Sequence, residues 1–340
     1  MKLLIVGEFS YGSLGLSYYN AFNKLISQVT RFDYIEELRA ISKLLRIKYF
    51  FRLLSPWSFK ILNDKLLRMV HDIQPDLILI IKGTIILPRT LIEIKKITQA
   101  QVFNFNPDNP FNLNSGASNN LIRESIPYYD CYFIWGRFLM SELLNKKARR
   151  VEYLPFGYDP ILHYPVIVND KEKKIYGNDL VFVGTWDKER EAFLAQVADY
   201  DLAIWGTGWE NIKWNSPLKS KLKHDFAIGL DFAKICNSSK IVLNHIRKQN
   251  GDAHNMRTFE VPACKGFMLT TRTKEQCEFF EEDKEIVCFE TPNELRIKID
   301  KYISLYNVRE EFKLNAYKKV QNCTYIERAK YVLETYNKLR

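Results

Sequence analysis

Hydrophobic positions in the first half of the chain occur in short continuous runs, separated by segments with helical periodicity. The runs LLIVGEF, PDLILIIKG, QVFNFN, YDCYFIWG and RRVEYLP are rich in β-branched and aromatic residues and too short for helices, so they predict buried strands. Helices are expected from Ser17, over 38–73, over 88–98 and near 116–125. Strands that alternate with helices predict a parallel, doubly wound sheet.

The pattern stops at DPILHYPVIVNDKEKKIYGND and then restarts. Prolines, charges and the lack of a sustained period favour a linker there. Beyond it DLVFVGTW, DLAIWGTGW, IVLNHI, GFMLTT and EIVCFE predict strands, with helices between them and from 292 to 340. We expect an N-terminal domain over 1–165, a linker over 166–178, a C-terminal domain over 179–310, and helices over 311–340 that pack back on the N-terminal domain.

The composition fits a folded protein with two cores. The chain has 340 residues, of which 46% are hydrophobic, so disorder is not expected. No run approaches the ~18 apolar residues of a membrane span, and the N-terminus lacks a signal-peptide layout. The six cysteines show no CxxC pair and no zinc-like spacing with the five histidines. We therefore expect reduced core cysteines, a cytoplasmic protein and no metal site.

The net charge is +10, and most of the excess lies in the first half of the chain. Residues 1–165 hold 21 Lys+Arg against 14 Asp+Glu, and residues 166–340 hold 29 against 26. The segment 38–73 carries eight Lys/Arg and two Asp among Leu, Ile, Phe and Trp at near-helical spacing. A solvated helix face is the simpler interpretation. The alternative is a helix pair on an anionic membrane surface, with Trp57, Phe50 and Phe51 at the interface and the protein peripheral on the inner face.

The segment HNMRTFEVPACKG places charge at the start of an otherwise apolar helix. Arg257 and Glu260 are spaced to pair across one helical turn, a contact worth ~0.2–0.5 kcal/mol. The apolar residues around them indicate a buried helix, in which unpaired charge is costly. A strand, IVLNHI, and a polar turn precede the helix. In an α/β sheet an anion binds at such a helix start, on backbone N–H groups and the positive end of the helix dipole.

Both halves resemble one family of enzymes. The series VFVGTWDKER, LAIWGTGW, IVLNHI, NMRTFEVPACKGFMLT and CTYIERAKYVL resembles the glycosyltransferase group 1 type of C-terminal domain, most of all the spore maturation protein CgeB-like branch. PDLILIIKG, FNFNPDNPF, YDCYFIWG and VEYLPFGYDP resemble that branch too. The resemblance implies the GT-B fold: two Rossmann-like domains with parallel sheets facing a central cleft, and no bound metal.

The same resemblance implies a function. A sugar would move from a nucleotide-sugar donor, linked to UDP, GDP or dTDP, to an acceptor hydroxyl. The donor would bind the C-terminal domain, and the acceptor, a glycan or lipid-linked molecule of the cell envelope, would bind mainly the N-terminal one. The nucleotide sugar is a substrate, so no cofactor is expected.

The resemblance also implies roles for residues of the C-terminal domain. Glu260 would accept hydrogen bonds from the ribose hydroxyls, Arg257 and the helix start would hold the diphosphate, and Arg190 would be a second cation. His245 is either a ligand contact or a structural histidine. The expected donor-binding set is Gly184, Thr185, Arg190, Gly206, Gly208, Trp209, Asn244, His245, Asn255, Arg257 and Glu260.

Two carboxylates are candidates for catalysis. Retaining members of the wider superfamily carry two glutamates, and Asp252 stands at the upstream position here. It is either catalytic or a loop residue that caps the next helix. Whether the reaction retains or inverts the anomeric configuration of the donor sugar therefore stays open. Asp108, in the NPDNP loop at a strand end, is a general base if the reaction inverts, and a turn residue otherwise. Glu8, Gly12 and Gly15 are expected on the acceptor side.

Other function classes fit the sequence less well. The glycines at 7, 12 and 15 do not have GxGxxG spacing, which argues against a dinucleotide oxidoreductase. The basic excess lacks the interleaved aromatic residues and the known modules of nucleic-acid binders, so no nucleic-acid partner is expected. A nucleic-acid-binding protein or a catalytically inactive scaffold of the same fold is the alternative to an enzyme.

Overall fold

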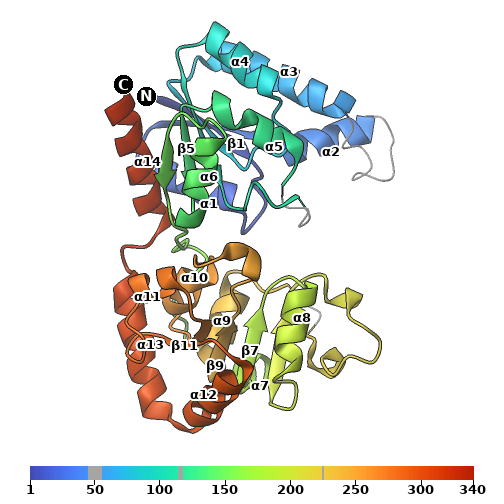
Figure 1. Ribbon diagram of the computed structural model, residues 1–340, viewed down its shortest axis with the longest axis vertical. Helices are drawn as coiled ribbons and strands as arrows, with labels where there is room; N and C mark the ends of the chain where they lie inside the picture. The colour runs from blue at the N-terminus through green and yellow to red at the C-terminus, as the bar shows by residue number, and fades with distance from the viewer. Residues whose placement is uncertain (45–55, 114–117, 224–225) are drawn as a thin grey trace. The chain divides into compact units, whose positions relative to one another are not determined.

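The computed structural model of the chain describes residues 1–44, 56–113, 118–223 and 226–340. These residues form two compact α/β units (Figure 1). Unit 1 comprises Met1–Pro155 and Tyr325–Arg340, and unit 2 comprises Phe156–Thr324. The change from one unit to the other therefore comes earlier in the chain than residue 166, where the sequence pattern placed the linker.

Unit 1 contains a six-stranded parallel sheet in the order β2-β1-β3-β4-β5-β6. Its strands are β1 (Lys2–Gly7), β2 (Gln28–Asp33), β3 (Leu77–Ile81), β4 (Gln101–Asn106), β5 (Cys131–Ile134) and β6 (Val151–Tyr153). Its helices are α1 (Leu14–Asn23), α2 (Tyr34–Leu44), α3 (Pro56–Ile73), α4 (Pro88–Ile97), α5 (Asn120–Ser125), α6 (Met140–Asn145) and α14 (Tyr325–Leu339). Strands β1, β3, β4 and β5 are buried almost throughout, which is why they read as apolar runs.

Unit 2 contains a five-stranded parallel sheet in the order β11-β10-β9-β7-β8. Its strands are β7 (Leu180–Val183), β8 (Leu202–Trp205), β9 (Ile241–Asn244), β10 (Met268–Thr271) and β11 (Val287–Phe289). Its helices are α7 (Asp170–Tyr176), α8 (Lys188–Ala195), α9 (Leu230–Ser238), α10 (Arg257–Ala263), α11 (Lys274–Phe279), α12 (Pro292–Ser304) and α13 (Tyr306–Val320). The first strand, β7, has β8 on one side and β9 on the other, so the strand order reverses between β7 and β9. In open α/β sheets ligands bind at the carboxyl ends of the strands at such a point.

Helix α7 lies within the stretch 166–178, where the sequence pattern predicted a linker. Its start is a capping box: the Asn169 side chain accepts the backbone N–H of Glu172, and the Glu172 side chain accepts the backbone N–H of Asn169. The Tyr176 hydroxyl donates to Asp231 of α9 at 2.7 Å. Residues 170–176 of the stretch therefore form a helix that belongs to unit 2 and contacts α9.

The C-terminal helix α14 belongs to unit 1, whereas α13 belongs to unit 2. The ring of Tyr325 lies 5.2 Å from that of Tyr18 in α1, and the Tyr331 hydroxyl donates to Glu152 Oε2 at 2.8 Å. Figure 1 shows α14 as the red helix beside β5. The helices expected over 311–340 are thus divided between the two units.

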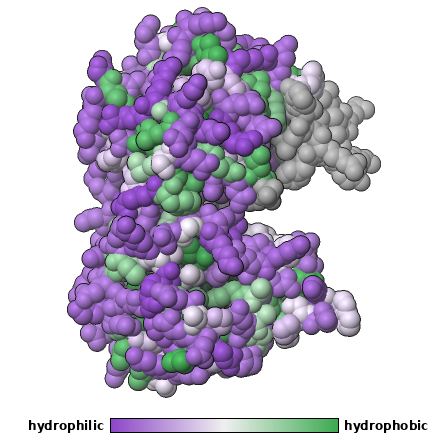
Figure 2. Space-filling model, viewed as in Figure 1, coloured by the Kyte–Doolittle hydropathy of each residue, from purple (hydrophilic) through white to green (hydrophobic). Residues whose placement is uncertain are grey.

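The basic segment 38–73 is only partly described. Helices α2 and α3 occupy its ends, and residues 45–55, which include Arg46, Lys48 and Arg52, lie outside the described residues. Trp57 is 53% exposed. Among the helices that the structure describes, none has the length and apolar character needed to span a bilayer. On the face shown in Figure 2, hydrophilic residues cover most of the coloured surface and hydrophobic residues form small separate patches.

Candidate functional site

The site in unit 2 begins with two glycine turns at the carboxyl ends of β7 and β8. Gly184 N–H donates to Trp205 O at 2.9 Å and Trp186 N–H donates to Thr207 O at 2.8 Å, so the strand pairing continues into the turns. Gly206 has a φ of +133°, and a Cβ there would lie 2.3 Å from the Gly184 carbonyl oxygen. Only glycine fits this approach, and the two turns form one continuous backbone surface.

Three arginines gather around these turns. Arg190 comes from α8, Arg247 from the loop after β9, and Arg257 from α10. Arg190 Nη1 donates to Thr185 O at 2.7 Å, and Asp187 Oδ2 lies 3.6 Å from both Arg190 Nε and Arg247 Nη1. Burial, followed by the charge of Arg247, lowers the pKa of Arg190 to about 10. A cation that is destabilised in this way is typical of a site that receives an anion.

Arg257 is held rigidly at the end of β7. Its Nε donates to Val183 O at 3.1 Å, and its guanidinium carbon lies 4.6 Å from the centre of the Phe232 ring. Its Nη1 bonds to the Glu260 carboxylate. Guanidinium has five N–H donors, so these two contacts leave donors for a ligand.

Glu260 is not directed at solvent, as a ribose-binding carboxylate in the free protein would be. It is 2% exposed, bonded to Arg257, and its Oε1 lies 3.6 Å from His163 Nε2. The structure therefore contains the pairing across one helical turn that the sequence offered as the simpler interpretation. Unit 2 itself therefore supplies two partners for this carboxylate.

His163 was not among the predicted site residues. Its Nδ1 accepts the backbone N–H of Asp159 at 3.3 Å, which assigns the proton of the neutral ring to Nε2, facing Glu260. Its ring makes an edge contact with Phe232 at 5.5 Å. Burial lowers its pKa, and the charge of Glu260 opposes that shift. His163 lies in DPILHYPVIVNDKEKKIYGND, where the sequence pattern predicts neither a strand nor a helix, so nothing marks it as a site residue.

Asn244 and Asn255 serve the internal structure of the unit. Asn255 Nδ2 donates to Asn244 Oδ1 at 2.8 Å, and Asn244 Nδ2 donates to Thr270 Oγ1 at 3.1 Å. Asn255 Oδ1 also accepts the backbone N–H of Thr258 at 3.3 Å. This network ties β9 and β10 to the start of α10 and uses one of the backbone donors that we expected to face phosphate.

Trp209 supports the glycine turns and does not offer a face to a nucleobase. It is 2% exposed, and its Nε1 donates to Gly184 O at 2.8 Å. Gly208, with a φ of +81°, forms the turn before it. A different tryptophan, Trp186, is half-buried and lines a cavity of about 750 Å³ between α8 and residues 211–217. The sequence pattern missed this aromatic residue.

His245 follows β9 and stacks on Phe193, with ring centres 4.5 Å apart. Its Nε2 lies 3.6 Å from Glu189 Oε1, and burial lowers its pKa. Its Nδ1 is buried and has no hydrogen-bond partner among the described residues. The ring thus belongs to the packing of α8, while one polar atom is left for another partner.

In unit 1 the predicted base, Asp108, lies at the carboxyl edge of the sheet. Its Oδ2 is 2.8 Å from Nζ of Lys82, which follows β3. Lys82 has a φ of +66°, an uncommon conformation for a residue with a side chain, and its N–H donates to Phe105 O at 2.8 Å. Asp108 N–H donates to Asn106 Oδ1 at 3.0 Å, so Asn106 makes the Asx turn. Lys82 was not predicted.

The residues expected on the acceptor side have structural roles at the end of β1 and the start of α1. Glu8 is exposed and accepts the Ser10 hydroxyl at 2.6 Å. Gly12 has a φ of +81°, and a Cβ on Gly15 would lie 2.2 Å from the Glu8 carbonyl oxygen. These glycines allow α1 to approach the end of β1.

Asp252 is exposed in the loop before α10. Its carbonyl oxygen accepts the N–H of Glu275 at 3.0 Å. The suggested cap on α10 is wrong for Asp252, because Asn255 accepts the Thr258 N–H at the start of that helix. No contact of its carboxylate with the arginine cluster is present among the described residues.

Comparison with known proteins agrees with this arrangement of elements. Residues 188–334 match a protein family described as glycosyl transferase-like. Among curated proteins, none matches the chain significantly. Solved structures with low sequence identity cover nearly the whole chain.

HepE from Anabaena, in complex with UDP and glucose, has a TM-score of 0.68 at 11% identity, and the match covers 99% of this chain and 100% of HepE. Sucrose-phosphate synthase from Thermosynechococcus elongatus has a TM-score of 0.68 at 11% identity, with 100% and 99% covered. A candidate UDP-N-acetylglucosamine 2-epimerase from Listeria monocytogenes has a TM-score of 0.59 at 11% identity, with 100% and 97% covered. The chain therefore has the GT-B fold, two α/β units with parallel sheets, and its residues 188–334 match the glycosyl transferase-like family.

Proposed function

We propose that the protein is a glycosyltransferase that moves a sugar from a nucleotide-sugar donor to an acceptor hydroxyl. The observation that carries the proposal is the arginine cluster of unit 2, Arg190, Arg247 and Arg257, at the carboxyl ends of β7 and β9. The diphosphate of a donor needs charge-assisted hydrogen bonds, and planar guanidinium groups supply them in pairs. In a transfer reaction the nucleoside diphosphate is the leaving group, so cations placed here stabilise the charge that develops on it.

Arg257 is the residue that we propose for the diphosphate, because Val183 and Phe232 fix its position and leave N–H donors for a ligand. Glu260 and His163 are proposed to orient it. The backbone at Gly184 and Gly206 lets a ligand approach closely, since neither carries a side chain.

The fold alone does not select transfer, because a candidate epimerase of nucleotide sugars has it as well. The family match over residues 188–334 favours transfer. Both reactions use a nucleoside diphosphate sugar, so the binding site and the reaction need separate tests.

The donor nucleotide, the transferred sugar, the metal requirement and the cellular location are proposals too. UDP is the first nucleotide to test, because HepE contains UDP or UDP-glucose in its structures, with GDP and dTDP as alternatives. We propose hexosyl transfer without a metal, since arginines can neutralise a diphosphate, and UDP binding that disappears in EDTA would contradict this. A CgeB-like role in envelope glycan synthesis and a peripheral position on an anionic membrane complete the proposal. Liposome flotation of the purified chain tests the latter.

The binding test compares UDP affinity by isothermal titration calorimetry in wild type, Arg257→Gln and Glu260→Gln. Arg257→Gln should weaken UDP binding by about tenfold or more, since a hydrogen bond to a charged group is worth ~1.5–3 kcal/mol. Glu260→Gln should weaken it less and also lower the melting temperature, because this carboxylate is buried against Arg257. Arg296→Gln is the matched control, since Arg296 pairs with Asp199 on the surface of the same unit.

Wild-type affinity in Arg257→Gln would remove the basis of the proposed anion site. The reaction is tested separately, by incubating the chain with UDP-glucose and with UDP-N-acetylglucosamine and separating the products. Release or transfer of sugar supports a transferase, and a new nucleotide sugar with inverted C2 supports an epimerase. UDP binding without either product supports an inactive scaffold.

A further inference from the structure

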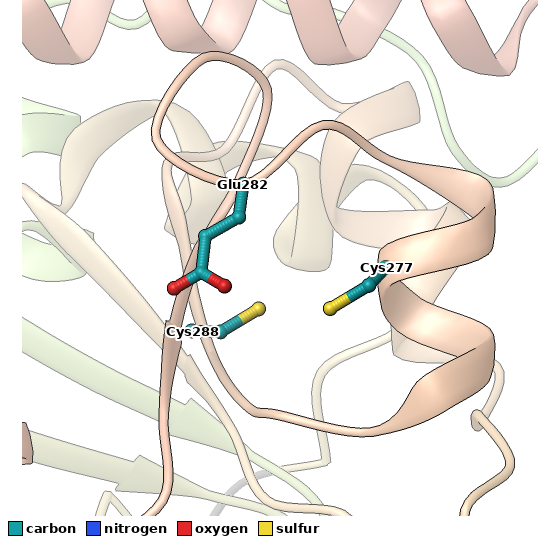
Figure 3. A group of neighbouring side chains, drawn as sticks. All are labelled: Cys277, Glu282 and Cys288. Atoms are coloured by element: carbon teal, nitrogen blue, oxygen red, sulfur yellow. The ribbon is translucent and has the colours of Figure 1, made fainter.

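Three side chains that can ligate metals converge at the edge of unit 2, in the part of its sheet farthest from β8. Cys277 comes from α11, Glu282 from the turn after α11, and Cys288 from β11. Their sulfur atoms and a carboxylate oxygen all lie within 4.8 Å of one another. Figure 3 shows the two sulfur atoms directed toward each other, with the carboxylate beside them. Strands β10 and β9 separate this cluster from β7 and the arginine cluster.

The carboxylate of this cluster is held in place. Arg272 Nη2 donates to Glu282 Oε1 at 2.6 Å and Arg272 Nε donates to Oε2 at 3.0 Å, while Lys298 Nζ donates to Oε1 at 3.3 Å. A carboxylate oxygen has two lone pairs, so Oε2 keeps one for a further partner. Both cations therefore orient Glu282 without using all of its capacity.

The charges around the cluster favour a divalent cation. Arg272 also pairs with Glu290 at 3.0 Å and with Glu294 at 3.2 Å. With both thiols protonated, the three glutamates outnumber Arg272 and Lys298 by one negative charge. If a divalent cation replaces the two thiol protons, that balance is unchanged. Uptake of the ion then adds no net charge to the cluster.

We propose that Cys277, Glu282 and Cys288 form a binding site for a zinc-type divalent metal ion. Two thiolates and a carboxylate are ligands that Zn²⁺ accepts in tetrahedral sites, and water would be the fourth ligand on the side of Cys277, which is exposed. Each thiol loses its proton to solvent as an S–Zn bond forms, and no electron is transferred. This spacing was missed because the cysteines were compared only with CxxC and histidine patterns.

The ion would act as a structural clamp between α11 and β11. Strand β11 is short and lies at the sheet edge, so it has one strand neighbour, β10. Helix α11 also carries Glu275, whose Oε2 lies 2.6 Å from Nδ1 of the buried His254. Fixing α11 therefore supports a second contact inside the unit. The proposal is independent of the sugar-transfer function.

The test uses the full chain, reduced and freed of metal, titrated with Co²⁺ alone. Thiolate ligation gives near-ultraviolet charge-transfer absorption, and we expect it to saturate at one Co²⁺ per chain and to vanish when Zn²⁺ is added. Cys277→Ser and Glu282→Gln should each weaken binding by about tenfold or more, the loss typical even for residues behind the ligands. Cys277 is exposed, so its variant is expected to fold. Cys323→Ser, outside the cluster, is the matched control and should bind as wild type does.

Four results would overturn the site. The first three are Co²⁺ binding without thiolate absorption, unchanged affinity in Cys277→Ser, and unchanged affinity in Glu282→Gln. A fourth is a Cys277–Cys288 disulfide, found by mass spectrometry, in a chain that takes up no Co²⁺ after reduction. Zn²⁺ should raise the melting temperature of the wild type and of Cys323→Ser but not that of Cys277→Ser.

Discussion

His163 shows how one buried side chain can make the stability of a binding site depend on pH. Burial lowers its pKa below the ordinary value of about 6.5. Between its folded pKa and about 6.5, the unfolded chain binds more protons than the folded chain. The free energy of unfolding therefore rises with pH in that interval and falls as the medium is acidified through it.

We predict that His163→Gln reduces this acid loss of stability. Glutamine can keep an N–H directed at Glu260, but it does not titrate. Urea unfolding at about pH 7.5 and about pH 5.5 measures the loss in each protein. His71→Gln is the control, because the His71 side chain is 73% exposed on α3 and its variant should lose as much stability as wild type. An equal loss in His163→Gln would show that His163 is not responsible.

The sequence identified Arg257 and Glu260, but it could not show which way the carboxylate points. The direction of the carboxylate depends on His163, which is far from α10 in the sequence. Its contact with Glu260 exists only in the folded unit. The same limit applies to Asp108, because its partner Lys82 follows a different strand. Residue types at strand ends could be predicted, whereas their pairing needed the tertiary structure.

At the scale of elements, the strands that the sequence predicted are buried almost throughout, except for the half-buried edge strand β6. Strand β2 was missed because it is an edge strand with the polar sequence QVTRFD and gives no apolar run. Helix α7 was missed because its buried contacts are few and its signal is the capping box at Asn169. Elements with weak hydrophobic patterns are found only through their caps or through pairing with a neighbour.

The turn after β8 gives a prediction at this scale. A Cβ on Gly206 would meet the Gly184 carbonyl oxygen at 2.3 Å, and its φ of +133° disfavours any side chain. Gly206→Ala should therefore destabilise the protein by about 1–3 kcal/mol and weaken UDP binding, because the paired glycine turns must separate. Urea unfolding and calorimetry measure the two effects.

Gly7→Ala is the control for this turn. Its nearest neighbour would be Ile81 Cβ at 3.4 Å, an ordinary contact, and its backbone conformation is open to other residues. We expect a smaller loss of stability and unchanged UDP affinity. If Gly206→Ala behaves like Gly7→Ala, the close approach of the two turns does not matter for binding.

At the scale of the whole molecule, the two units are not two consecutive halves of the chain, because unit 1 is built from two separate segments. The last helix, α14, completes unit 1, although in the sequence all of unit 2 comes between this helix and the rest of unit 1. The sequence predicted two α/β halves correctly, because each repeats the alternation of strands and helices. It placed the division at residue 166 because prolines and charges there resemble a linker.

The two units also divide the proposed chemistry, which makes the role of Asp108 testable. Asp108 belongs to unit 1 and the arginine cluster belongs to unit 2. If the reaction inverts, the acceptor hydroxyl must lose its proton as the glycosidic bond forms. A carboxylate that takes this proton typically contributes 10²–10⁴-fold to the rate. Among the described residues, Lys82 contacts one oxygen of Asp108, and we propose that the other faces an acceptor.

Asp108→Asn should then lower the turnover of UDP-sugar by about a hundredfold or more and leave UDP affinity unchanged, since asparagine keeps the shape but cannot take the proton. Asp72→Asn, on an exposed part of α3, is the control and should keep wild-type turnover. Lys82→Met distinguishes a general base from a structural residue. If Asp108 only stabilises the turn, Asp108→Asn and Lys82→Met should both lower the free energy of unfolding. Near-normal turnover in Asp108→Asn, or a product that retains the anomeric configuration of the donor, would leave the carboxylate with its structural contacts alone.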